Sequence, residues 1–156
     1  MGIISPKKLN NASKVLLTLF LIILAPLLII AVLLYLFWGA ILCLLIWLSW
    51  KKRFVIFVYS NSPTWKDYIE VEILPYIQDR AVILNWSERR MWKNSLPVLA
   101  FRYFGGHKNF NPIGIVFRPF RLARTYRFFE AFQEFKHGDH KKVQRMKEKL
   151  FEVLDV

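Results

Sequence analysis

Two short polar segments contain the side chains best suited to hold a small anion. The first is Ser60-Asn61-Ser62, and the second combines Asn85 with Glu88 and Arg89. Each follows an apolar run typical of a buried strand, and open α/β sheets bind ligands beyond the carboxyl ends of parallel strands. Hydroxyls, amides, an arginine and a helix start favour a phosphate or carboxylate. An enzyme acting on a phosphorylated or acidic small molecule would use these residues.

The same segments also have a purely structural interpretation. Ser62 followed by Pro63 is a typical helix start, in which the serine caps free backbone N–H groups. Glu88 and Arg89 then belong only to the solvated first turn of another helix. No glycine-rich phosphate loop is present to favour the binding interpretation.

Four arginines recur at intervals of three residues within an aromatic segment: Arg118, Arg121, Arg124 and Arg127. Cations interleaved with rings occur where single-stranded nucleic acid binds. They also occur in basic segments that lie on anionic lipid headgroups. In the structural alternative the rings are core and the arginines face solvent. With a long apolar segment upstream, we expect lipid headgroups rather than nucleic acid.

The sequence predicts no metal site and no cofactor. His137 and His140 have the spacing of a ligand pair, but the lysines that flank them oppose a bound cation. The single cysteine, Cys43, lies in the apolar segment. A cysteine nucleophile, a redox-active dithiol and Cys-ligated zinc are therefore excluded for the remainder of the chain.

Residues 15–50 contain no charged side chain and predict a transmembrane anchor with a kink near Pro26. A basic segment, 1–14, precedes the anchor, and a basic α/β domain, 51–156, follows it. A single kinked crossing is favoured over a tight hairpin because no polar turn divides the run. The apolar run is also too long for a cleaved signal peptide. The larger basic excess follows the anchor, which favours a cytoplasmic domain.

The elements that must position the polar segments follow the anchor in a regular order. Strands are predicted at 54–59, 81–86, 98–104 and 112–117, with helices after Ser62, after Ser87, over 123–136 and from Asp139 onward. The expected order is β-α-β-α-β-β-α with an extra C-terminal helix. The first strand, helix and second strand form a βαβ unit, which implies a parallel pair.

This order, with Pro97 just before the predicted third strand, resembles the thioredoxin and glutaredoxin fold over residues 54–136. The resemblance implies a small mixed sheet and a cis proline opposite the loop that begins the first helix, here residues 60–65. It also implies a groove beside Pro97 that accepts extended peptide. The family's paired cysteines are absent from that loop, so its thiol-disulfide chemistry does not carry over.

The sequence therefore predicts a single-pass membrane protein whose basic domain is a non-catalytic binding or scaffold module. Its expected partners are the lipid bilayer, through anionic headgroups, and a protein or peptide. Two alternatives remain open: a membrane-bound enzyme acting at loops 60–64 and 85–90, and nucleic-acid binding, which the anchor makes the less favoured of the two.

Overall fold

The computed structural model describes residues 10–49, 54–108, 111–119 and 121–155. A single helix, α1 (Asn11–Ser49), contains nearly all of the apolar segment. It continues through Pro26 and Gly39, so the segment forms one helix rather than a hairpin. This helix is long and apolar enough to cross a membrane.

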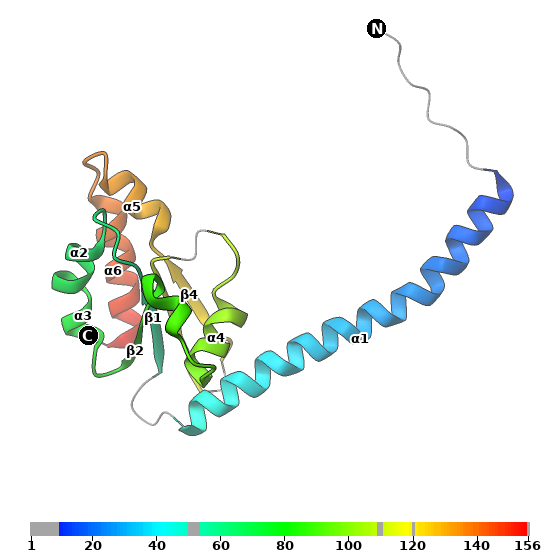
Figure 1. Cartoon of the computed structure of the whole chain (residues 1–156), viewed down its shortest axis with the longest axis horizontal. Helices are drawn as coiled ribbons and strands as arrows, with labels where there is room; N and C mark the ends of the chain where they lie inside the picture. Colours follow the sequence, from blue (N-terminus) through cyan, green and yellow to red (C-terminus); the bar gives the residue numbers. More distant parts are fainter. Residues whose placement is uncertain (1–9, 50–53, 109–110, 120, 156) are drawn as a thin grey trace, which may run out of the picture. The chain divides into compact units, whose positions relative to one another are not determined.

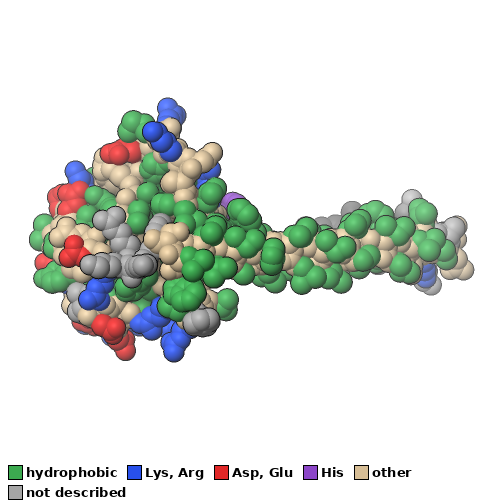
Figure 2. All heavy atoms as spheres, turned by 90° about the horizontal axis from the view of Figure 1, so that it is seen from below, with side chains coloured by type: hydrophobic (Ala, Val, Ile, Leu, Met, Phe, Trp, Pro, Cys, Tyr) green, Lys and Arg blue, Asp and Glu red, His purple; other side chains and the backbone are tan. Residues whose placement is uncertain are grey.

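The chain divides into two compact units, residues 1–38 and 39–156. In the first unit, the large apolar side chains of α1 that are exposed, from Val15 to Trp38, have exposed fractions of 48–71 %. Figure 2 shows hydrophobic side chains covering most of the visible surface of this helix. Within its described residues, the first unit therefore contributes a helix that is apolar on every side from Val15 to Trp38.

The second unit is built on a four-stranded mixed sheet. Its strands are β1 (Val55–Tyr59), β2 (Ala81–Asn85), β3 (Ile113–Val116) and β4 (Arg124–Arg127). The spatial order is β2-β1-β3-β4. Strand β1 pairs in parallel with β2 and antiparallel with β3, and β3 pairs antiparallel with β4. The mixed α/β class and the parallel β1–β2 pair are confirmed.

Helices cover both faces of this sheet (Figure 1). They are α2 (Lys66–Glu72), α3 (Leu74–Ile77), the 3₁₀ helix η1 (Trp86–Met91), α4 (Leu96–Phe104), α5 (Phe129–Phe135) and α6 (Lys141–Leu154). Alternate side chains of β1 point to opposite faces. Val55 and Phe57 join the core under α2, α3, α5 and α6, whereas Ile56 and Val58 join the core under α4.

The first core is dominated by aromatic rings. Phe57, Phe128 and Phe132 are fully buried. Trp65, at the start of α2, packs against Phe129 and Phe132 with ring centroids 6.3 and 6.0 Å apart. These contacts attach α2 and α5 to the same face of the sheet.

The last turns of α1 help to cover the second face. Leu42 and Ile46 are each only 1 % exposed, and Ile46 packs in one cluster with Ile56, Phe101 and other buried residues of β3 and α4. A Cβ atom on Gly39 would lie 2.5 Å from the hydroxyl oxygen of Tyr103 in α4. The folded unit thus includes the end of the apolar helix.

Two elements differ from the sequence-based expectation. Residues 98–104, predicted as a strand, belong to the helix α4, and the predicted helix 123–136 begins instead with the strand β4. Pro97 lies in the first turn of α4, where a proline is well tolerated because no N–H is needed there. It is therefore not the proline that precedes the third strand. That position belongs to Pro112, whose peptide bond to Asn111 is cis.

Candidate functional site

The two predicted polar loops lie side by side at one edge of the sheet. Because β1 and β2 are parallel and Tyr59 pairs with Asn85, the loops that leave these strands emerge together. The backbone N–H of Asn61 donates to the Ser87 hydroxyl at 3.0 Å, and the Asn85 amide donates to the Asn61 side-chain oxygen at 3.0 Å. Segments 60–64 and 85–90 therefore meet through direct contacts.

Asn85 is the central residue of this polar cluster. Its Oδ1 accepts from the Ser87 backbone N–H at 3.0 Å, which caps η1. Its Nδ2 group donates to Asn61 and, at 3.2 Å, to the carboxylate of Glu88. The side-chain amide offers two donor hydrogens and one acceptor oxygen, and all three functions are used within the cluster.

Ser62 has a turn-forming role. Its hydroxyl accepts from the backbone N–H of Thr64 at 3.4 Å, and its carbonyl accepts from the N–H groups of Trp65 and Lys66. The N-cap of α2 is Trp65, three residues further on. Ser62 thus shapes the turn before α2, and the expected cap at this serine is displaced. Ser60 is half-buried at the end of β1.

The guanidinium group of Arg89 lies over an aromatic ring. The guanidinium carbon lies 4.9 Å from the centre of the Trp86 ring, and one guanidinium nitrogen donates to the Trp86 carbonyl at 3.3 Å. Trp86 in turn contacts Trp92 and Phe101 edge to face. The arginine remains exposed, so its charge is accessible at the rim of the polar cluster.

Tyr59 lies beneath the cluster and is protonated at neutral pH. Burial, and then the hydrogen bond to the Glu70 carboxylate at 3.0 Å, raise the pKa of Tyr59 to about 12. Its phenol is a structural donor rather than a base. The cluster itself is composed of the Ser87 hydroxyl, the Asn61 and Asn85 amides and the Glu88 carboxylate.

Pro112 occupies the position that was expected for Pro97. Since Val58 pairs with Ile113, the antiparallel register sets Pro112 opposite Tyr59, beside the start of the 60–64 loop. Pro112 is buried, and its carbonyl accepts from the N–H of Phe128. The signal in the sequence is an Asn-Pro pair directly before the short apolar run Ile113–Val116, which marks a strand start.

The four spaced arginines do not lie on one helix. Arg118 and Arg121 follow β3, whereas Arg124 and Arg127 are the first and last residues of β4. The guanidinium of Arg118 donates to the Val153 carbonyl at the end of α6, and that of Arg127 donates to the Lys108 carbonyl at 2.8 Å. Arg121 and Arg124 are exposed. The set therefore combines two structural donors with two accessible cations.

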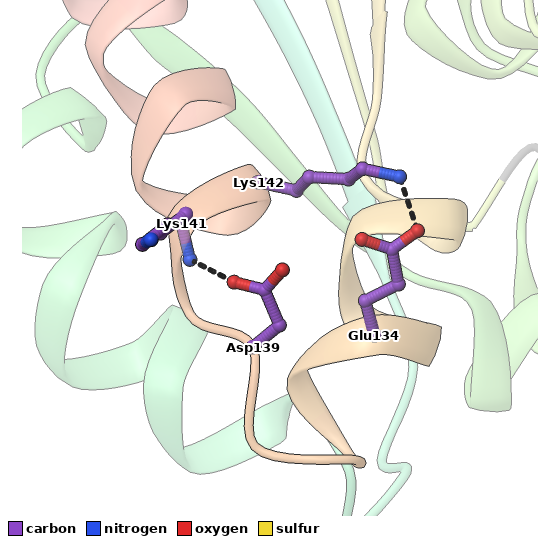
Figure 3. A network of polar contacts seen from close by, with 4 residues as sticks. All are labelled: Glu134, Asp139, Lys141 and Lys142. Carbon is purple, nitrogen blue, oxygen red and sulfur yellow. Dashed lines mark hydrogen bonds and ion pairs between the residues drawn. The ribbon is translucent and has the colours of Figure 1, made fainter.

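The turn that contains His137 and His140 is held by other groups (Figure 3). Asp139 accepts from the backbone N–H of Lys141 at 3.0 Å, and Lys142 forms an ion pair with Glu134. His140 packs its ring against Phe135 at a centroid distance of 4.3 Å. Across residues 10–49, 54–108, 111–119 and 121–155, no group of three or more metal-ligating side chains is found.

No protein-family model matches the chain, and no curated protein or solved structure is significantly similar to it. The geometry of the chain itself is thus the basis for its functional interpretation.

Proposed function

We propose that this protein crosses a membrane once through α1 and holds a non-catalytic binding domain against the bilayer surface. One observation carries the proposal: α1 is exposed and apolar from Val15 to Trp38, and its next turns bury Leu42 and Ile46 in the core of the folded unit. The helix is therefore both anchor and domain element.

The length of the exposed part supports a single crossing. Residues 15–38 would rise about 36 Å as a helix, and a hydrocarbon layer is about 30 Å thick. A signal peptide is a poorer interpretation because its apolar region is about 7–15 residues long. The helix also continues without interruption into residues that the domain core uses.

The architecture of the domain supports a thioredoxin-like assignment as part of this proposal. The strand order β2-β1-β3-β4, the parallel β1–β2 pair and the antiparallel β3 are the arrangement that the family resemblance implies. A proline directly precedes β3, at Pro112. The loop after β1 has Ser60, Asn61 and Ser62 where the family has its paired cysteines, which supports binding rather than thiol chemistry.

The experiment uses the full chain expressed in cells. We expect it to stay in the membrane pellet after extraction with alkaline carbonate and to be released by detergent. In sealed vesicles, protease should reach residues 51–156 only from the cytoplasmic face, as the cations Lys51, Lys52 and Arg53 favour. Recovery of the intact chain in the soluble fraction would overturn the proposal.

The contact between loops 60–64 and 85–90 favours a second candidate function, recognition of a small acidic or phosphorylated ligand at this edge. The observation that favours this candidate is the polar cluster of Asn61, Asn85 and Ser87 beside the exposed Arg89. Arg89→Gln removes the cation and its contact with the Trp86 ring, while Arg90→Gln changes a neighbouring exposed arginine, and thermal unfolding checks that both variants remain folded. A difference in ligand binding between these two variants would support the candidate, and equal behaviour would reject it.

A further inference from the structure

The folded unit contains a cavity that no role proposed above uses. It has a volume of about 870 Å³ and lies at the end of the sheet where β1 begins and β3 ends. Ile46 and Trp47 of α1, Phe54 before β1 and Phe117 after β3 form much of its apolar wall. This size and apolar character are typical of sites that bind small or lipid-like molecules.

Two arginine side chains also line this cavity. Arg118 is half-buried and fixed by its hydrogen bond to the Val153 carbonyl, whereas Arg121 is exposed. Asp155 also lines the cavity and opposes an anion, but the two arginines outweigh its single carboxylate. A site with an apolar wall and a positive rim is complementary to an amphiphile with an anionic head.

The other side of the same helical turns is apolar and unburied. Leu44 and Leu45 are 51 % and 42 % exposed. Cys43 follows Trp38 by five positions of α1, a helical rise of about 8 Å, and this is about the depth of one headgroup layer. Lipid is therefore the molecule most concentrated beside this part of the chain if α1 crosses a bilayer.

We propose that this cavity binds an anionic phospholipid, with the phosphate at Arg118 and Arg121 and part of an acyl chain along Trp47, Leu48 and Phe54. The inference rests on the proposed membrane anchorage and adds a specific lipid site to it. The chain's net charge of +12 agrees with an anionic rather than a zwitterionic headgroup.

The single cysteine provides a direct probe, because Cys43 lines the cavity. The full chain is placed in nanodiscs of phosphatidylcholine alone or with added phosphatidylglycerol, and alkylation by N-ethylmaleimide is followed by mass spectrometry. Bound lipid should shield the thiol and slow alkylation severalfold in the discs with phosphatidylglycerol. Inorganic phosphate added to phosphatidylcholine discs should not slow it, which distinguishes the phospholipid from a free anion.

A relocated thiol controls for the general effect of a charged surface on the reaction. The double variant Cys43→Ser with Leu44→Cys carries its thiol one residue away, on the exposed side of α1. Its alkylation should be the same in both kinds of disc. An equal slowing at positions 43 and 44 would overturn the proposal, because it would indicate a surface effect.

The charge requirement is tested with Arg121→Gln, since Arg118 also stabilises α6. Loss of one basic residue near an anionic surface should weaken binding about fivefold and restore alkylation of Cys43 accordingly. Lys149→Gln, at an exposed lysine of α6, is the matched control and should change nothing. If Arg121→Gln leaves the protection of Cys43 intact, the cavity site is wrong.

Failure of this proposal is distinguishable from failure of the membrane anchor. Carbonate extraction of the same variants reports the anchor alone. A chain that stays in the membrane but shows no selective protection of Cys43 retains the proposed anchor and loses the lipid site. A chain absent from the membrane loses both.

Discussion

Gly39, the first residue of the folded unit, allows the last turns of α1 to approach α4 closely. A Cβ atom there would lie 2.5–2.6 Å from three atoms of the Tyr103 ring and hydroxyl, which is closer than atoms pack. A glycine inside a helix costs about 1 kcal/mol relative to alanine, so this position trades helix propensity for a close contact between α1 and α4.

We expect Gly39→Ala to destabilise the protein by about 1–3 kcal/mol, because overpacking must displace Tyr103. In a Tyr103→Ala background the same substitution should cost little or become favourable, since the space is then open. Thermal unfolding of the full chain in detergent, for the four members of this double-mutant cycle, measures the coupling. Additive effects would show that the two residues do not contact each other.

The protonation of Tyr59 gives the domain a specific response to alkali. Its pKa is about 12 in the folded state against an ordinary 10.0, because of burial and the bond to Glu70. The unfolded chain therefore releases this proton at a lower pH than the folded chain. The stability that Tyr59 contributes is present below pH 10 and is lost as the pH rises toward 12.

The free energy of denaturant unfolding, measured from pH 9 to 11.5, should fall more steeply for the natural chain than for Tyr59→Phe. Other tyrosines and the lysines titrate in both proteins, so the difference between the two curves isolates Tyr59. Tyr76→Phe, at a tyrosine that is 55 % exposed, is the matched control and should retain the steeper curve. Parallel curves for the natural chain and Tyr59→Phe would contradict the assignment.

At the scale of elements, three of the four strands were predictable and the fourth, β4, was not. β1, β2 and β3 follow from short apolar runs bounded by turn residues, and the contact between the loops after β1 and β2 follows from their parallel pairing. β4 has the polar sequence Arg-Thr-Tyr-Arg, and its extended form depends on pairing with β3, which a local pattern does not contain.

The helix α4 was also missed by the local sequence pattern, which predicted a strand in its place. Residues 98–104 form a nearly continuous apolar run, and such a run does not distinguish a buried strand from a helix. The distinguishing signal was Ser95 followed by Pro97, an N-cap and first-turn pair that opens a helix. Within the candidate site, the positions of Asn61 and Asn85 were predictable because each follows the end of a strand. The contacts of Ser87 and Pro112 with the 60–64 loop depend on how β1 pairs with β2 and β3, which the sequence does not specify.

Two residues of α4 test the helix directly. In a strand, Leu99 and Phe101 would point to the same face, whereas in the helix Leu99 is 37 % exposed and Phe101 is 4 % exposed. We expect Leu99→Ala to change the free energy of unfolding by less than about 1 kcal/mol, and Phe101→Ala to cost about 3–5 kcal/mol. Equal, large losses would indicate that both side chains are buried.

At the scale of the whole molecule, the last turns of α1 belong to the folded unit and contribute to its core. The second face of the sheet is covered by α4 together with Ile46 and Cys43 of α1. A domain that began at residue 54 would leave that part of its core open to water. The last turns of α1 and the domain are thus energetically connected, which differs from a tether that joins two independent parts.

This connection predicts unequal effects of neighbouring substitutions in the same helix. Ile46→Ala should lower the free energy of unfolding by about 2–5 kcal/mol, because the side chain fills space between α1 and the sheet. Leu45→Ala, one residue earlier and 42 % exposed, removes a similar volume from the outer side and should cost much less. Denaturant unfolding of the full chain in detergent, followed by tryptophan fluorescence, compares the two. If both substitutions leave the transition unchanged, α1 is only a tether and the domain folds independently of it.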